Sequence, residues 1–146
     1  MQLNLSVLPG RTKKLCFCGK NLLSIPKDLP SDLRKLYISG NNITKLENLP
    51  AGLLFLDISN NQITTLENLP PDLQCLQIRD NQITELNHLP PNLLNLDIIN
   101  NRIMKLKCLP PKLQTLCVLG NQITIVENLP PSLQKIDIFS GAASGR

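Results

Sequence analysis

Hydrophobic and polar positions recur with one fixed period along most of the chain. The pair Leu-Pro marks that period, because it stands at 29–30, 49–50, 69–70, 89–90, 109–110 and 129–130. Between these pairs the chain follows the pattern L-x-x-L-x-I-x-x-N-x-I-T-x-L-x-x-L-P, which residues 53–70 match in full. Self-similarity at such a period predicts a stack of repeated units rather than one core built from unrelated segments.

The repeat unit predicts a short strand, a turn and an extended return. Its L-x-I segment alternates with period two, which is typical of a strand. No segment has the 3.6-residue period of an amphipathic helix, and proline pairs such as 70–71 favour extended, polyproline-like backbone. One unit cannot bury its apolar side alone, whereas stacked copies can. We therefore predict a solenoid with a parallel β-sheet on its concave face, an extended convex side and few or no helices.

One asparagine recurs in each repeat where the chain leaves the predicted strand. An inward amide at that point can bond backbone groups that the turn leaves unpaired. We therefore assign these residues a structural role, as a ladder, and not a ligand-binding role. The ladder comprises Asn41, Asn61, Asn81, Asn101 and Asn121.

The pattern L-x-x-L-x-I-x-x-N-x-I resembles the leucine-rich repeat. The 20-residue period and the Leu-Pro over residues 31–139 are similar to the short bacterial type. That type occurs in YopM-like and IpaH-type effectors, which pathogens deliver into host cells. The repeated ITxLEN is also similar to SDS22-like repeats. The resemblance implies a scaffold that binds proteins through its concave sheet. IpaH-type ligases also carry a domain with a catalytic Cys beyond their repeats, and nothing in this chain matches that domain.

Residues 1–30 are expected to form an N-terminal capping strand and a divergent first repeat. Alternating apolar residues predict a strand over residues 2–7 that covers the open end of the stack. In the first repeat, Leu15 matches Leu36 only if one extra residue is allowed between them. This stretch also resembles the first repeat of extracellular leucine-rich proteins. In that alignment Phe17 stands where the family has a Cys, so the disulfide cap that the resemblance implies lacks that Cys.

The chain beyond the repeats of residues 31–139 loses the pattern. Residues 140–146 are mostly small, and the ladder Asn is missing. We expect them to be a disordered tail or a remnant of an expression vector.

Candidate binding residues occupy the strand positions between the inward Leu and Ile, where side chains face out across the sheet. These positions vary between repeats while the scaffold does not. Recognition of a partner would produce such variation, and so would drift on an unselected surface. The candidates are Lys35, Tyr37, Phe55, Asp57, Gln77, Arg79, Asp97, Ile99, Cys117, Leu119 and Phe139.

Three of these candidates are apolar and would lie side by side on adjacent strands: Ile99, Leu119 and Phe139. Contiguous exposed apolar groups usually mark an interface. We expect them to dock a partner element or to support a homo-oligomer through this C-terminal apolar patch. The alternative is that a missing cap or further repeats cover them.

Catalytic and metal sites are not indicated. Asp57 and Asp97 share a column but stand on alternate repeats, about 9–10 Å apart by strand spacing, on an open face. His88 has no nucleophile that the pattern places nearby. Cys16 and Cys18 form a CxC pair, which is a weak metal signal because a structural zinc site needs four ligands. We expect no enzymatic activity, no cofactor and no metal in this chain, although a catalytic domain could be missing from it.

Composition and charge limit the classes of partner and the cellular compartments that we expect. Residues 1–35 carry seven Lys and Arg against two Asp, whereas the rest is nearly neutral with eight basic and nine acidic residues. A basic end without interleaved aromatics disfavours nucleic-acid binding. The odd count of five cysteines predicts free thiols in an intracellular reducing compartment, which is the host cytosol for a secreted effector. No apolar run is long enough to span a membrane, and residues 1–10 lack the features of a signal peptide.

The sequence therefore predicts a non-enzymatic scaffold that binds a protein of unknown identity. Two alternatives stay open: the substrate-recognition fragment of a larger ubiquitin-ligase-type effector, and a self-assembling repeat protein.

Overall fold

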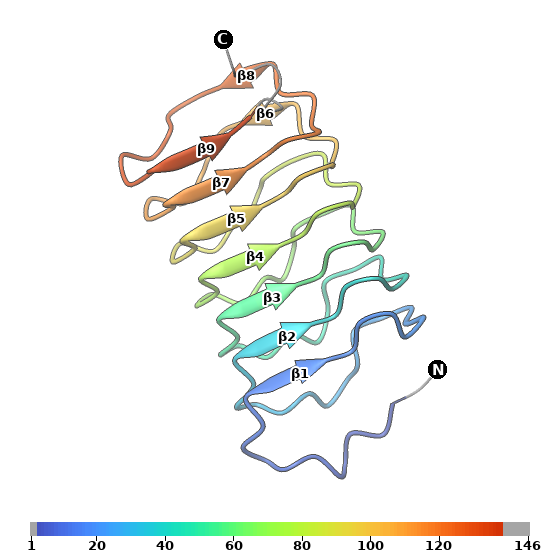
Figure 1. Ribbon diagram of the computed structural model, residues 1–146. Coiled ribbons are helices and arrows are strands. Elements are labelled where there is room, and N and C mark those ends of the chain that lie inside the picture. Colours follow the sequence, from blue (N-terminus) through green and yellow to red (C-terminus); the bar gives the residue numbers. More distant parts are fainter. Residues whose placement is uncertain (1–2, 139–146) are drawn as a thin grey trace.

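The computed structural model describes residues 3–138, which form a stack of similar turns with no helix among them (Figure 1). Each turn contributes one short strand to the same side of the stack, and β1 and β9 lie at its opposite ends. The strands are β1 (Lys14–Cys16), β2 (Lys35–Tyr37), β3 (Phe55–Asp57), β4 (Cys75–Gln77), β5 (Asn95–Asp97), β6 (Lys105–Leu106), β7 (Thr115–Cys117), β8 (Ile125–Val126) and β9 (Lys135–Asp137).

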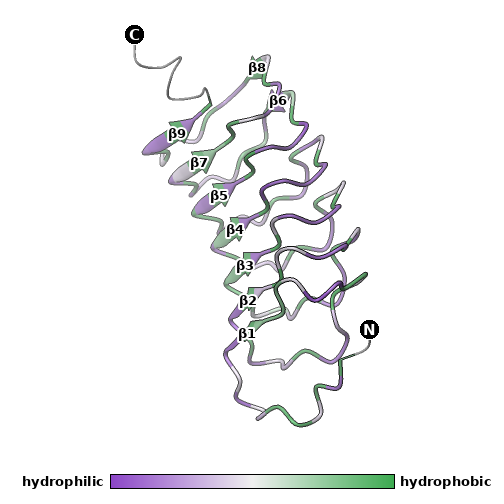
Figure 2. Cartoon of the chain, turned by 45° about the vertical axis from the view of Figure 1, so that its right-hand side comes forward, coloured by the Kyte–Doolittle hydropathy of each residue, from purple (hydrophilic) through white to green (hydrophobic). Residues whose placement is uncertain are grey.

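Seven strands form one parallel sheet in the order β1-β2-β3-β4-β5-β7-β9. The register pairs like positions of successive repeats, as in Leu56 opposite Leu76. It also pairs Leu15 with Leu36, so the extra residue predicted in the first repeat is confirmed. Strands β6 and β8 form a second parallel pair on the opposite side of the last turns (Figure 2). The predicted solenoid with a parallel sheet is confirmed.

The core is aliphatic and runs the length of the stack. The central residue of each strand from β2 to β7 in the large sheet is a Leu with at most 2% of its surface exposed. Full burial of one such side chain contributes about 1.5–3 kcal/mol. Burial weakens at the C-terminal end, where no further turn covers the last one among the described residues. Leu106 in β6 is fully buried, but Val126, one turn later, is 44% exposed.

The ladder asparagines bond backbone groups of two successive turns. Asn81 Oδ1 accepts a hydrogen bond from Ile63 N at 2.9 Å. Its Nδ2 donates to the carbonyl oxygens of Ile58 and Arg79 at 3.1 Å and 3.0 Å. The same arrangement recurs at the other four ladder positions. Each ladder amide therefore joins backbone groups of neighbouring turns.

Two positions in most turns have a left-handed backbone, which Asn, Asp and Gly adopt more readily than other residues. One position follows the strand. The other precedes Leu-Pro, and its φ lies between 49° and 63°. His88 and Cys108 occupy the second position, where three other repeats have Asn. The recurrence of Asn before Leu-Pro therefore has a conformational cause. The two series are Gly40, Asn60, Asp80, Asn100 and Gly120, and Asp28, Asn48, Asn68, His88, Cys108 and Asn128.

The strand predicted for residues 2–7 is absent over the part that the structure describes, and this prediction is wrong. Asn4 Oδ1 accepts hydrogen bonds from Ser6 N at 3.0 Å and from Ser6 Oγ at 2.6 Å. An Asn side chain that bonds the backbone two residues on stabilises a turn in place of an extended strand. Leu3 nevertheless packs against the core, whereas Val7 is 83% exposed.

Candidate functional site

The side chains that point outward from the seven-stranded sheet form one continuous surface, here called the sheet face. Two columns flank the inward-facing central residue of each strand. The parallel register aligns Lys35 with Phe55 in the first column and Tyr37 with Asp57 in the second. The first column is Lys14, Lys35, Phe55, Cys75, Asn95, Thr115 and Lys135, and the second is Cys16, Tyr37, Asp57, Gln77, Asp97, Cys117 and Asp137.

A third column continues past the strand ends. The hydrogen bond from Asn100 N to Leu119 O, 2.8 Å long, and that from Asp80 N to Ile99 O, 2.9 Å long, extend the ladder between turns. Ile99 and Leu119 therefore come together, and both are half-buried. Phe139, the third member of the predicted apolar patch, lies outside the described residues.

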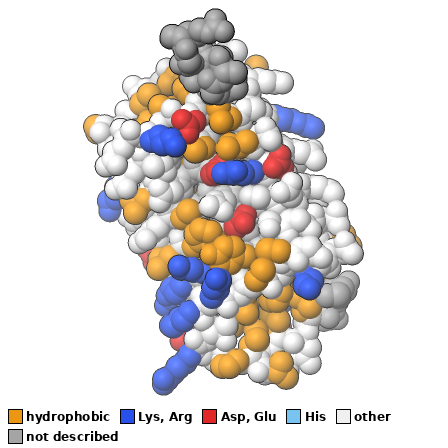
Figure 3. All heavy atoms as spheres, viewed as in Figure 1, with side chains coloured by type: hydrophobic (Ala, Val, Ile, Leu, Met, Phe, Trp, Pro, Cys, Tyr) orange, Lys and Arg blue, Asp and Glu red, His pale blue; other side chains and the backbone are white. Residues whose placement is uncertain are grey.

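An aromatic and cationic cluster occupies the N-terminal part of the sheet face. The rings of Tyr37 and Phe55 have centroids 4.8 Å apart, and Lys14 Nζ lies 4.9 Å from the Tyr37 ring centroid. Both distances fall within the ranges of aromatic pairing and cation–π attraction. Figure 3 shows apolar side chains gathered over the middle of this face, with Lys and Arg groups beside them. Lys14 was not among the sequence candidates, although the extra residue in the first repeat already aligns it with Lys35.

Carboxylates and their partners occupy the sheet face from β3 to its C-terminal end. Arg79 Nε donates to Asp97 Oδ2 at 2.6 Å, and this hydrogen bond raises the pKa of the Arg79 guanidinium. Asp57 Oδ1 accepts a bond from Ser59 N at 3.1 Å, and Asp137 Oδ2 lies 3.4 Å from Lys135 Nζ. Each carboxylate of this column is therefore held by a local partner.

This arrangement does not resemble a pair of catalytic carboxylates. Asp57 in β3 and Asp97 in β5 are separated by Gln77 in β4. Glycosidases place two carboxyl groups on opposite sides of the bond that they cleave, but here both project from one open sheet. His88 is exposed and occupies the left-handed position before Leu-Pro, away from the strands.

The thiols differ in environment. Burial raises the pKa of the Cys75 thiol, and Asp97 and Asp57 add to this effect. Burial likewise raises the pKa of Cys117, again with Asp97 acting in the same direction. The pKa of Cys16 is lowered instead, first by hydrogen bonding from the Cys18 backbone and side chain. Thiols with a raised pKa on the sheet face are poor nucleophiles at neutral pH.

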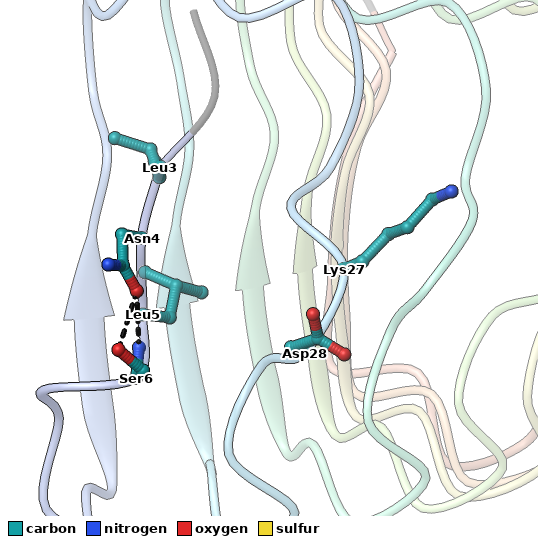
Figure 4. A pocket seen from close by; sticks show the side chains of 6 residues that line it. All are labelled: Leu3, Asn4, Leu5, Ser6, Lys27 and Asp28. Carbon is teal, nitrogen blue, oxygen red and sulfur yellow. Dashed lines mark hydrogen bonds between the residues drawn. The ribbon is translucent and has the colours of Figure 1, made fainter.

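A hollow of about 590 Å³ lies away from the sheet face, between the N-terminal segment and the return of the first turn (Figure 4). Asn4 and Ser6 bond each other there, while Lys27 extends away from them. Its lining lacks the paired groups of a nucleophile and a base. The lining residues are Leu3, Asn4, Leu5, Ser6, Lys27 and Asp28. Over residues 3–138, no three His, Cys, Asp or Glu side chains come together as a candidate metal site. The same residues include no helix long and apolar enough to cross a membrane.

Comparison with known proteins agrees with this geometry. The family model of leucine-rich repeats in two copies matches residues 31–71. YopM from Yersinia enterocolitica is 40% identical, with a TM-score of 0.75 over 82% of this chain. The chain is a leucine-rich repeat solenoid of the bacterial type, similar to the repeat domains of YopM-like and IpaH-type effectors.

Two further solved structures resemble this leucine-rich repeat solenoid at 25% identity. An internalin from Listeria monocytogenes has a TM-score of 0.63 over 77% of this chain. The leucine-rich repeat domain of a Shigella effector has a TM-score of 0.59 over 91%. The chain spans 27% of the YopM chain, 38% of the internalin and 73% of the Shigella domain. No curated protein matches the chain.

Proposed function

We propose that this chain is a non-enzymatic module that binds a folded protein partner through the sheet face. The observation that carries the proposal is the contrast between adjacent columns. The inward column is Leu in every strand of the large sheet except β9, which has Ile136. The outward columns change from turn to turn, from Lys35 to Phe55 to Cys75 and from Tyr37 to Asp57 to Gln77. A scaffold held constant under a varied surface suits recognition.

The chemistry of the sheet face suggests what the partner presents. Tyr37 and Phe55 offer the rigid aromatic area that often dominates binding energy. Lys14 and Lys35 beside them favour an acidic group next to an apolar one on the partner. Asp57 lies opposite Tyr37 in the register and favours a basic group on the partner. A partner surface with an apolar centre between charges of opposite sign fits this order.

The test is capture of the partner from host-cell lysate by three immobilised versions of the chain. Wild type and Lys105→Glu should retain the same protein, because Lys105 is exposed in β6 on the opposite side. Phe55→Glu should lose that protein while its circular dichroism stays unchanged. Equal capture by Phe55→Glu, or loss with Lys105→Glu alone, would place binding elsewhere.

A role inside host cells belongs to the same proposal. It is supported by the similarity to a Shigella effector domain and to YopM, and the host cytosol is the compartment it implies. The second candidate is the substrate-recognition part of a larger ubiquitin-ligase-type effector, favoured by the 73% of the Shigella domain that the chain spans. Reading the gene beyond this segment separates the two, since a following domain with a catalytic Cys supports the second.

Self-association is a further candidate, favoured by the C-terminal end of the stack. Val126 and Leu129 are 44% and 42% exposed, and Ile136 is only partly buried. Antiparallel pairing of β9 with a second copy, centred on Ile136, would set Lys135 opposite Asp137 of that copy, so the edge is complementary to itself in charge. Light scattering after size exclusion tests this candidate. Dimers that disappear in Asp137→Lys support it, and a monomer at high concentration contradicts it.

A further inference from the structure

Two thiols lie together at the N-terminal end of the sheet face. Cys16 ends β1 and is exposed, and Cys18 follows in the turn after the strand. Their sulfur atoms are 3.3 Å apart. Ser39 Oγ of the next turn donates to Cys18 Sγ, also at 3.3 Å. Neither thiol is among the groups proposed above to bind a partner.

The surroundings favour the thiolate form of Cys16. Hydrogen bonding from the Cys18 backbone and thiol lowers the pKa of Cys16, and the charges of Lys14 and Lys20 act in the same direction. A lowered pKa and exposure together make a thiol reactive toward disulfides. Cys75 and Cys117 are the contrast, since burial raises the pKa of both.

We propose that Cys16 and Cys18 form a reversible dithiol–disulfide pair, which a low-molecular-weight disulfide such as glutathione disulfide oxidises. The inference goes beyond the proposed binding function and does not depend on it.

The reaction proceeds in two exchanges. The Cys16 thiolate attacks one sulfur of glutathione disulfide, which forms a mixed disulfide on Cys16 and releases one glutathione thiolate. Cys18 then gives its proton to solvent, and its sulfur attacks the Cys16 sulfur. The Cys16–Cys18 bond forms, and the second glutathione thiolate leaves. The chain has lost two electrons and two protons, and glutathione disulfide has gained them as two thiols.

Closure requires the two sulfurs to approach from 3.3 Å to the covalent length of about 2.05 Å. The backbone must bend just after β1, where Phe17 N donates to Tyr37 O at 2.7 Å and Gly19 N donates to Ser39 O at 2.9 Å. Bending strains these bonds at the edge of the sheet. Strained and exposed disulfides are more easily reduced than structural ones, so the pair should reopen in excess thiol.

The test is peptide mapping of the whole chain after reaction with glutathione disulfide and acid quenching. Tryptic cleavage after Lys14 and Lys20 leaves both cysteines on the peptide of residues 15–20. That peptide should become lighter by two hydrogen atoms and regain its mass with dithiothreitol. The control is Cys108, an exposed thiol after β6 that tryptic cleavage isolates on residues 108–112. It should carry glutathione instead, and more slowly.

Two variants separate the steps. Cys18→Ser should stop at glutathione on Cys16, because the second attacking thiol is gone. Cys16→Ser should leave Cys18 reacting no faster than Cys108. Glutathione that accumulates on the wild-type peptide without an internal disulfide would overturn the proposal. Closure as fast in urea as in the folded chain would also overturn it, because the folded arrangement would then contribute nothing.

Discussion

Replacing Asn81 by Ala removes one amide from the middle of the ladder and tests whether the ladder holds the turns together. Asn81 is 7% exposed. Its Oδ1 accepts from Ile63 N, and within the described residues this is the sole hydrogen-bond partner of that N–H. Its Nδ2 shares two protons among three carbonyl oxygens, those of Ile58, Ile78 and Arg79.

The loss in the free energy of unfolding depends on which backbone groups keep another hydrogen-bond partner when Asn81 is removed. Ile58 O retains Asn61, Ile78 O retains Asn101, and Arg79 O retains the backbone N–H of residue 60. Only the N–H of Ile63 is orphaned, at a cost of about 1–3 kcal/mol. Each of the two lost amide N–H bonds adds about 0.5–1.5 kcal/mol. The free energy of unfolding should therefore fall by about 4 kcal/mol, within a range of about 2–6 kcal/mol.

The matched control is Asn121→Ala. Asn121 makes the same set of bonds, with Oδ1 accepting from Ile103 N and Nδ2 donating to Ile98 O and Val118 O. It lies in the last turn and is only half-buried, so water can reach the groups it leaves. Its loss should cost about 1 kcal/mol.

Urea unfolding followed by circular dichroism measures both changes, with a constant dependence on denaturant as the check that the unfolded states are comparable. Equal losses for Asn81→Ala and Asn121→Ala, or a loss below about 1 kcal/mol for Asn81→Ala, would show that burial does not set the strength of the ladder bonds.

Three further predictions concern single side chains. Cys108→Asn should raise the free energy of unfolding by about 1 kcal/mol, because Cys108 is exposed at φ 56°, a conformation that Asn adopts more readily; a lower urea midpoint would contradict this. Burial raises the pKa of Cys75, so the unfolded chain ionises first and stability should fall as pH rises above about 8.5. The urea midpoint should fall less from neutral to alkaline pH for Cys75→Ala than for wild type. An identical fall would contradict the attribution of this pH dependence to the Cys75 thiol. Leu119→Glu should leave circular dichroism unchanged because Leu119 is half-buried on the sheet face, and unfolding would instead place it in the core.

Periodicity made the solenoid predictable. Once the Leu-Pro pairs are aligned from repeat to repeat, parallel pairing of like positions is the arrangement that buries every Leu and Ile at once. The register of Phe55 with Cys75 and the inward Asn61 follow from that alignment alone. The first turn was predictable for the same reason, because one extra residue there shifts Leu15 to Leu36 without changing which face is buried.

Features that depend on local hydrogen bonding or backbone conformation were harder to predict. The alternation in residues 2–7 predicts a strand, but the Asn4 side chain competes for the backbone of Ser6 and turns the chain. The left-handed position of His88 was signalled by Asn68 one period earlier, since Asn favours that conformation. The cation–π contact of Lys14 with Tyr37 depends on the directions of two side chains, which the aligned register alone does not give.

We propose that partner recognition lies on the sheet face and not on the opposite side. A photo-activated cross-linking residue placed at position 55, and separately at position 105 in β6, tests it with the partner that the wild-type chain captures. We expect a cross-linked complex from position 55 and none from position 105. Cross-linking from position 105 alone would contradict it.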